Sequence, residues 1–333
     1  MPIARGILYL ASCVPVDIIA CNSRIGAMPV VTTIKNTLKG FSDQKAVAIR
    51  RRARDTTVTT TDVRKTTNAI FLIFDNVQHF HKQRDLRIGR ENNMIIGIAA
   101  TYIQLEVDAS ACDLLDKRRR IAMNLRKDVS VDQILGLIDQ NHLKIVGRLQ
   151  WIQALVNNIQ ELSIYKEDVA IRYRTRAAKL QLPIRKSEIH PLATSGKNEA
   201  LISGLKDGMI DFLDQMGQGE GDYDFRLWFG GGDGMSFNNM LILKKYLQTH
   251  KDVFHRFEMM QTVLQAWHTM WTDLSRLFGT HWGDSLDNNP ATIAWSAKKI
   301  GRAAPANLKK VDYYPTAQLL SLLHDAQMLD AWR

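Results

Sequence analysis

The stretch Asn68-Ala-Ile-Phe-Leu-Ile-Phe-Asp75-Asn76 decides how the rest of this chain is interpreted. Its apolar run is typical of a fully buried strand, and the run leads directly into an acid. A second stretch of the same kind, Arg226-Leu-Trp-Phe-Gly-Gly-Gly-Asp233-Gly234, follows 158 residues later. Two strands that each end in an aspartate can place two carboxylates side by side. Paired carboxylates are the ligands that a divalent metal needs.

Length and composition indicate a folded protein. The chain has 333 residues, of which 45% are hydrophobic, and it contains seven tryptophans. A chain of this kind buries a large core and is long enough for one large domain or two. The composition therefore excludes an intrinsically disordered protein.

The formal net charge is +10, and it is spread unevenly. Basic residues exceed acidic ones in residues 1–68 and 111–190, whereas residues 201–240, which include Asp233, are acidic. A basic surface beside an acidic pocket suits a polyanion, such as DNA, held over a metal site. The alternative interpretation is that these charges lie on solvated helix faces.

Cysteine usage predicts a compartment. Cys13, Cys21 and Cys112 share no metal-binding spacing, and their odd number predicts an intracellular protein, either nuclear or cytoplasmic. The apolar patch at residues 6–16 is short and broken by Pro15, so we interpret it as a buried helix rather than a signal peptide. Because no apolar run reaches the length of a membrane span, we expect no membrane partner.

The chain is expected to fall into two parts. Residues 1–58 are predicted to form an N-terminal helical, basic segment. Residues 59–333 are predicted to form a single α/β core, with a helical insertion at about residues 109–218.

The strands of this core are predicted from apolar runs. Ala69–Phe74 is interpreted as one strand that ends at Asp75, and Met94–Val107 as one or two more. The intervening stretch Gln78–Asp85 is interpreted as a polar loop. Its two histidines, at positions 79 and 81, would share one side of an extended segment.

Arginines gather in three segments that we treat as candidate nucleic-acid contacts. They either contact phosphates or lie on ordinary charged helix surfaces, and the sequence leaves both interpretations open. One segment carries Tyr173 among its arginines, a combination of cation and aromatic that favours nucleic-acid contact. The candidates are Arg50, Arg51, Arg52 and Arg54, then Arg118 and Arg119, then Arg172, Arg174 and Arg176.

Aspartates at the ends of buried strands indicate a class of fold. In RNase-H-like nucleases and transposases, one catalytic acid lies on the first strand, one just after the fourth, and a third on a later helix. Two magnesium ions bridged by such acids activate water and stabilise the leaving oxygen. We therefore predict a helix-rich α/β fold with an RNase-H-like mixed sheet, in which Asp75 and Asp233 bind Mg²⁺ or Mn²⁺. The alternative is that both aspartates are helix caps or turn residues.

Several short motifs also carry a family resemblance. They are Phe74-Asp-Asn-Val-Gln78, Arg87-Ile-Gly-Arg-Glu-Asn92, His190-Pro-Leu-Ala-Thr-Ser-Gly-Lys-Asn-Glu199, Gly232-Asp-Gly234, Trp267-His-Thr-Met-Trp-Thr-Asp-Leu274 and His281-Trp-Gly283. With them the chain resembles, over roughly residues 5–333, a fungal, mainly mushroom-forming (basidiomycete) family of uncharacterised proteins, catalogued as domain of unknown function 6589. The resemblance implies a link to mobile elements, because several members belong to them or derive from them.

The resemblance also bears on individual residues. It implies that Asp75 and Asp233 follow the family's aspartate-after-strand pattern and that His268 lies on the family's histidine-bearing helix. Two positions depart from the family pattern: Val77-Gln78 stands where asparagine is frequent, and Gly234 stands where a Gly-Asp-Gln motif has glutamine. Related chains are longer at both ends, so this chain is expected to be a fragment or a degenerate copy.

Three functions remain open from the sequence. The first is a transposase-derived, RNase-H-like nucleic-acid-processing core that holds DNA on its basic helices. The second is a catalytically inactive DNA-binding or protein-interaction module of the same fold. The third is another metal hydrolase, with His268 and either His79 or His81 as ligands. For the first, the catalytic candidates are Asp75, Asp233, Asp273 as the third acid, and His268.

Overall fold

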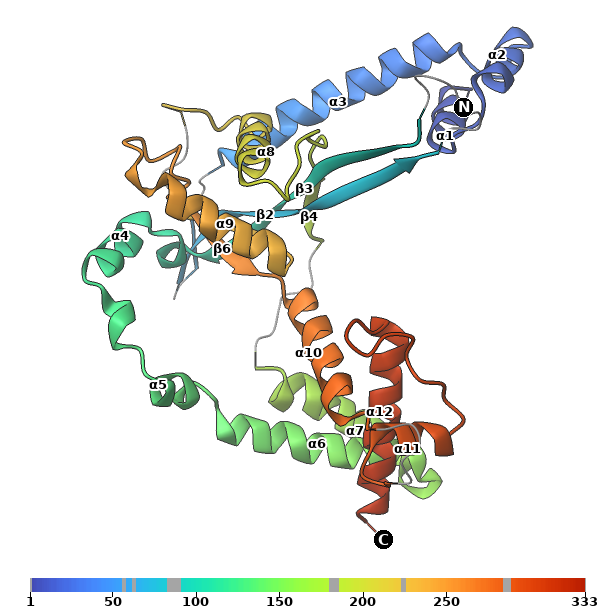
Figure 1. The fold of residues 1–333 in the computed structure, drawn as a ribbon, viewed down its shortest axis with the longest axis vertical. Helices are drawn as coiled ribbons and strands as arrows, with labels where there is room; N and C mark the ends of the chain where they lie inside the picture. The colour runs from blue at the N-terminus through green and yellow to red at the C-terminus, as the bar shows by residue number, and fades with distance from the viewer. Residues whose placement is uncertain are drawn as a thin grey trace. The chain divides into compact units, whose positions relative to one another are not determined.

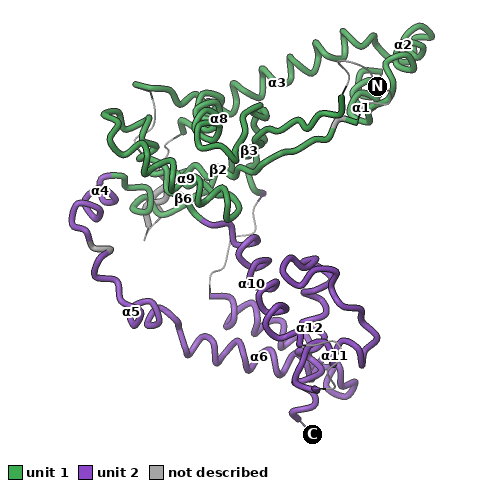
Figure 2. The backbone as a smooth tube through the Cα atoms, viewed as in Figure 1, with its two compact units in different colours: residues 1–114, 187–263 green, residues 115–186, 264–333 purple. Residues whose placement is uncertain are grey.

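The structure is a computed structural model that describes residues 2–55, 58–61, 64–82, 91–179, 186–222, 226–283 and 289–332. The chain forms two compact units, each built from two separate stretches (Figure 2). Unit 1 comprises residues 1–114 and 187–263, and unit 2 comprises residues 115–186 and 264–333. Unit 1 contains the sheet and both stretches that carry the candidate aspartates.

Unit 1 is organised around a mixed, six-stranded sheet (Figure 1). The strand order is β4-β3-β2-β5-β6, and β1 pairs with β2 off this path. Strand β2 is antiparallel to β3 on one side and parallel to β5 on the other, which confirms the prediction of a helix-rich α/β protein with a mixed sheet. The strands are β1 (Val58–Thr61), β2 (Arg64–His81), β3 (Asn93–Asp108), β4 (Glu188–Pro191), β5 (Trp228–Gly232) and β6 (Met260–Leu264).

Strand β2 extends well beyond its apolar run. The prediction that it ends at Asp75 is wrong, because it continues to His81, with Asp75 paired to Ala99 of β3. Most residues after Phe74 are exposed, but β3 still satisfies their backbone groups. The apolar run therefore marks the part of the strand that is covered, and not its length.

The same pairing corrects the predicted loop between the strands. Residues 78–81 belong to β2, whereas the rest of that stretch, from residue 83, lies outside the described residues. The range predicted as one or two further strands is a single strand, β3.

Helices bury apolar stripes against this sheet. On α8, Leu205, Met209 and Phe212 recur at the helical period, and they lie in one apolar cluster with Leu72 and Phe74 of β2. The helices α3 and α9 add residues to the same cluster, and α1 and α2 pack with the first half of α3 in a smaller one. The helices are α1 (Pro2–Ala11), α2 (Val16–Arg24), α3 (Val31–Ala53), α8 (Ile202–Gln215) and α9 (Gly234–Tyr246), with 3₁₀ turns η1 (Ala109–Cys112) and η5 (Leu247–Thr249).

The regular secondary structure of unit 2 is helical in its described residues, apart from Leu264 at the end of β6. Its apolar cluster joins α10, α11 and α12 through residues such as Phe278, Ala297 and Leu323. β4 and α8 belong to unit 1, although they fall within the range predicted as a helical insertion. The elements are α4 (Leu114–Ala122, which begins at the last residue of the first stretch of unit 1), η2 (Leu125–Asp128), α5 (Val131–Gly136), α6 (Gln140–Asn158), η3 (Gln160–Tyr165), α7 (Lys166–Arg172), the π-helical turn η4 (Tyr173–Ala177), α10 (Ala266–His281), α11 (Ile293–Lys299) and α12 (Tyr313–Asp330).

The core of unit 1 yields a stability prediction. Leu205 is fully buried, so Leu205→Ala should lower the free energy of unfolding by about 2–5 kcal/mol, because apolar packing is removed and a cavity remains. Leu241 on α9 is 46% exposed, so Leu241→Ala should change the free energy of unfolding by less than about 0.5 kcal/mol. Urea unfolding followed by tryptophan fluorescence measures both. Equal losses of stability would contradict the packing of α8 against the sheet.

Candidate acidic site

Asp75 and Asp233 lie level with each other on neighbouring strands. The parallel register of β2 and β5 pairs Phe71 with Phe229 and Ile73 with Gly231. Two residues further along, the same register brings the chain to Asp75 on β2 and to Asp233 just after β5. The two aspartates therefore reach the same edge of the parallel pair, although only the second follows the end of a strand.

Asp233 also has a structural role. It is the N-cap residue of α9, and its Oδ1 accepts hydrogen bonds from the backbone N–H of Ser236 at 2.7 Å and from the Ser236 hydroxyl at 2.8 Å. This is the helix-cap alternative considered from the sequence, and the structure confirms it for this aspartate. Asp75 is exposed, and its Oδ1 accepts the N–H of Asn76 at 2.8 Å.

A third carboxyl group, Glu199, accompanies the pair. Its side chain is fully buried, and its Oε1 contacts the hydroxyl of Ser236. Its Oε2 is also buried and has no hydrogen-bond partner among the described residues. A buried carboxyl oxygen without a partner is costly, so this atom is the feature of the site that most needs an explanation.

Close backbone packing holds Glu199 in place. The backbone carbonyl of Asn198 lies so near Gly204 of α8 that a Cβ there would come within 2.2 Å of it. Only glycine permits this approach. The Nδ2 of Asn239 on α9 donates to the backbone carbonyl of Glu199 at 3.3 Å. Contacts from both helices thus fix the segment that precedes α8.

The electrostatics of the site favour a neutral Glu199. Burial raises the pKa of its carboxyl, the charges of Asp233 and Asp75 raise it further, and the hydrogen bond from Ser236 works in the opposite direction. The Ser236 hydroxyl has one proton to share between Glu199 and Asp233. Ser236 therefore connects the two acids, while the raised pKa of Glu199 favours its neutral form.

The three acids do not form a closed metal cage. Within the described residues, the one group of three potential ligands whose atoms all lie within 4.8 Å of one another is Glu220, Asp252 and His255, elsewhere in unit 1. The carboxylates of the acidic site are therefore spaced more widely. A metal shared by all three would require these side chains to move closer together.

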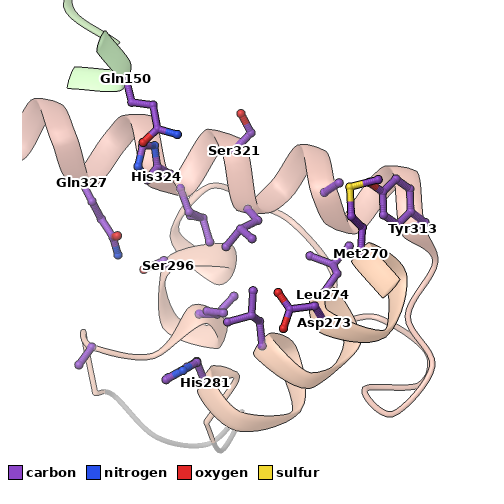
Figure 3. Close-up of a pocket in the computed structure, with 16 residues that line it drawn as sticks. Gln150, Met270, Asp273, Leu274, His281, Ser296, Tyr313, Ser321, His324 and Gln327 are labelled. Carbon is purple, nitrogen blue, oxygen red and sulfur yellow. The ribbon is translucent and has the colours of Figure 1, made fainter. Parts of the chain in front are cut away.

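Unit 2 contains the other candidate catalytic residues. His268 lies on α10 with its ring edge-on to Trp267, at a centroid distance of 4.8 Å. Asp273, on the same helix, lines a pocket of about 720 Å³ together with His281 and His324 (Figure 3). The predicted third acid, Asp273, thus belongs to unit 2, whereas the acid beside Asp75 and Asp233 in unit 1 is Glu199. His79 is exposed on β2, and the side chain of His81 is outside the described set.

Two of the four candidate arginines at the end of α3, Arg52 and Arg54, have partners within unit 1. Arg52 contacts Glu188 and lies 3.0 Å from Nε2 of His190. Arg54 donates to the Asp222 carboxylate at 2.6 Å and to the backbone carbonyl of Gly217. The side chain of Arg50 packs closely against the same glycine. These contacts attach the end of α3 to β4 and to the turn after α8. Arg51 is exposed.

The remaining candidate arginines lie in unit 2. Arg119 pairs with Asp116, and Arg174 pairs with Glu167 at 2.8 Å. Arg118 is half-buried. Arg172 and Arg176 are exposed, at the end of α7 and in η4.

Comparison with known proteins identifies the family. Residues 124–333 match the family of unknown function DUF6589, and because this is more than half of the chain, the protein belongs to that family. The matched segment includes Glu199 and Asp233 and begins after Asp75. No curated protein and no solved structure matches the chain. Within the described residues, every helix is too short or too polar to cross a bilayer.

Sequence reasoning missed Glu199, although a signal was present. This residue ends the longest motif of the family resemblance, His190–Glu199, and lies shortly before a helix. The expectation that the third acid lies on a later helix led instead to Asp273. Burial of an acid between two helices depends on tertiary packing, which no local pattern reveals.

The raised pKa of Glu199 predicts a pH dependence. Above the ordinary value of 4.5 the unfolded chain releases this proton before the folded protein does, so stability should fall as pH rises through the window between the two pKa values. Glu199→Gln removes the ionisation and should flatten that decline in melting temperature, measured by calorimetry from pH 4.5 to 8. Asp214→Asn, at an exposed acid of α8, should leave the slope unchanged. If melting temperature falls with pH equally in the wild type and in Glu199→Gln, the raised pKa of Glu199 is not the cause of the decline.

Proposed function

We propose that unit 1 is an RNase-H-like core that processes nucleic acid with a divalent metal, Mg²⁺ or Mn²⁺. Counted from β2 as the first strand, the sheet order is third, second, first, fourth, fifth, with the fourth parallel to the first. This arrangement supports the proposal, because RNase-H-like proteins carry catalytic acids on the first strand and just after the fourth. Asp75 and Asp233 occupy these two positions.

One observation carries the proposal: the unpartnered, buried Oε2 of Glu199 beside two aspartates at the same edge of the sheet. Such an atom is satisfied when a cation reaches the site. Asp75 and Asp233 would hold the metal, and Glu199 would complete its ligands after losing its proton. Ser236 would keep Asp233 and Glu199 oriented. A bound divalent metal would activate water and stabilise the leaving oxygen of a phosphodiester.

The resemblance to a fungal, basidiomycete family with members in mobile elements supports a further part of this proposal. We infer that the core descends from a transposase, and that its nucleic acid is DNA. The departures at Val77-Gln78 and Gly234 lie beside the two aspartates. They favour a second candidate, a catalytically inactive DNA-binding or protein-interaction module. The use of Asp233 as a helix cap supports this second candidate as well.

A cleavage assay tests the catalytic proposal. With Mg²⁺ or Mn²⁺ and labelled DNA, Asp75→Asn, Asp233→Asn and Glu199→Gln should each lower cleavage or strand transfer by roughly 100-fold or more, because each removes a metal ligand. Asn at position 233 still caps α9, so the fold is retained. Asp214→Asn is the matched control. Activity of Asp75→Asn equal to wild type would refute the proposal, whereas loss in Asp273→Asn with full activity in Glu199→Gln would make Asp273 the third acid in place of Glu199.

DNA binding separates the two candidate functions. Binding through phosphates weakens with salt, and the slope of log K against log salt changes by about 0.9 for each phosphate that the protein no longer neutralises. Arg172→Gln and Arg176→Gln should each reduce that slope by about 1, as measured by fluorescence anisotropy. Arg54→Gln should leave it unchanged, since its guanidinium pairs with Asp222. Salt-dependent binding without metal-dependent cleavage would favour the inactive module, and absence of binding would refute DNA as the partner.

A further inference from the structure

A second group of metal-ligand side chains lies in unit 1, outside the acidic site. Glu220, Asp252 and His255 each offer one ligand atom, and these atoms all lie within 4.8 Å of one another. Nδ1 of His255 is 3.1 Å from Oδ1 of Asp252 and 3.9 Å from Oε1 of Glu220. The imidazole therefore lies within reach of both carboxylates.

Two turns bring these side chains together. Glu220 lies in the turn from Gly219 to Asp222, which is closed by two backbone hydrogen bonds of 3.1 and 3.3 Å. Asp252 and His255 lie between η5 and β6, where Oδ1 of Asp252 accepts the backbone N–H of His255 at 2.9 Å. The group thus joins the connection that follows α8 to the connection that precedes β6.

A neighbouring histidine fixes the imidazole. The ring of His250 packs against that of His255, with centroids 4.9 Å apart and planes 31° from parallel. Nδ1 of His250 accepts the backbone N–H of Asp252 at 3.2 Å, so this nitrogen has its own role. His255 is consequently held between a ring on one side and a carboxylate on the other before any ligand binds.

The two distances from His255 and the mixed ligand types are compatible with zinc. Zinc binds nitrogen and carboxylate oxygen at about 2.0–2.2 Å, so neighbouring ligands of a tetrahedral site lie roughly 3.4 Å apart. The distances of 3.1 and 3.9 Å lie on either side of this value. Mixed imidazole and carboxylate ligands favour zinc over magnesium or calcium, which prefer oxygen alone.

We propose that Glu220, Asp252 and His255 bind Zn²⁺, with a water molecule in the fourth position. Glu220 and Asp252 are 66% and 37% exposed, so the ion has access from solvent. The bound ion would fasten two turns that flank β5 in the chain and would fix the start of β6, the last strand in the order of the sheet. This site is independent of the proposed function, because it uses none of the residues of the acidic site.

Zinc binding to the full-length protein tests the proposal. Equilibrium dialysis with ZnCl₂ and atomic emission should show a bound ion, and zinc should raise the melting temperature of the wild type. His255→Gln and Glu220→Gln should weaken binding by roughly 10-fold or more and abolish the rise. Glu220 is an exposed turn residue, so Glu220→Gln keeps the test valid if His255→Gln fails to fold. His324→Gln, at a histidine of unit 2, should bind as the wild type does.

The acidic site supplies the second comparison. Asp233→Asn should retain the zinc response, because its side chain belongs to the other site. Loss of zinc binding in Asp233→Asn with retention in Glu220→Gln would overturn the proposal and assign the ion to the acidic site. Absence of zinc binding by the wild type would also overturn it. Neither result depends on DNA cleavage, so the two proposals fail separately.

Discussion

The parallel pairing of β2 with β5 is the constraint on which the rest of unit 1 depends. A parallel pair requires a long crossover, and here the chain passes through β3, β4, α8 and the first stretch of unit 2 before it returns. A slip of one residue would turn each side chain of β5 to the opposite face of the sheet. The register that pairs Ile73 with Gly231 is therefore also what brings Asp75 and Asp233 to the same level.

The position of the two aspartates affects the charge state of the Glu199 carboxyl. This carboxyl is buried between the helices that cover the sheet, where its charged form is destabilised by loss of water and by the two aspartates. Nothing in packing alone requires an acid at this position, since an apolar residue would avoid the unpartnered Oε2. Burial of a carboxyl oxygen without a partner lowers stability, and such losses are typical of functional sites. Glu199 therefore indicates a functional site more strongly than the exposed Asp75 does.

The sequence predicted the parts of the structure that local patterns encode. The apolar run before Asp75 located the central strand, and the apolar start of the second stretch located β5, although the glycines that follow it belong to the strand as well. The continuation of β2 to His81 could not be predicted, because exposed residues there form a strand only through pairing with β3. The same reason explains why Glu199 was missed and why the ion pairs of Arg54 and Arg52 were not foreseen: Asp222 and Glu188, their partners, lie far along the chain.

Asp233 shows why the structural and catalytic interpretations of an acid need not compete. Among the described residues, its side-chain hydrogen bonds from Ser236 are all accepted by Oδ1, which caps α9. The cap fixes the carboxylate at the start of a helix, where the backbone N–H groups stabilise negative charge. The other oxygen then keeps a defined direction without taking part in the cap. A residue held in this way has a fixed orientation, so the cap is compatible with the proposed metal role as well as with a purely structural one.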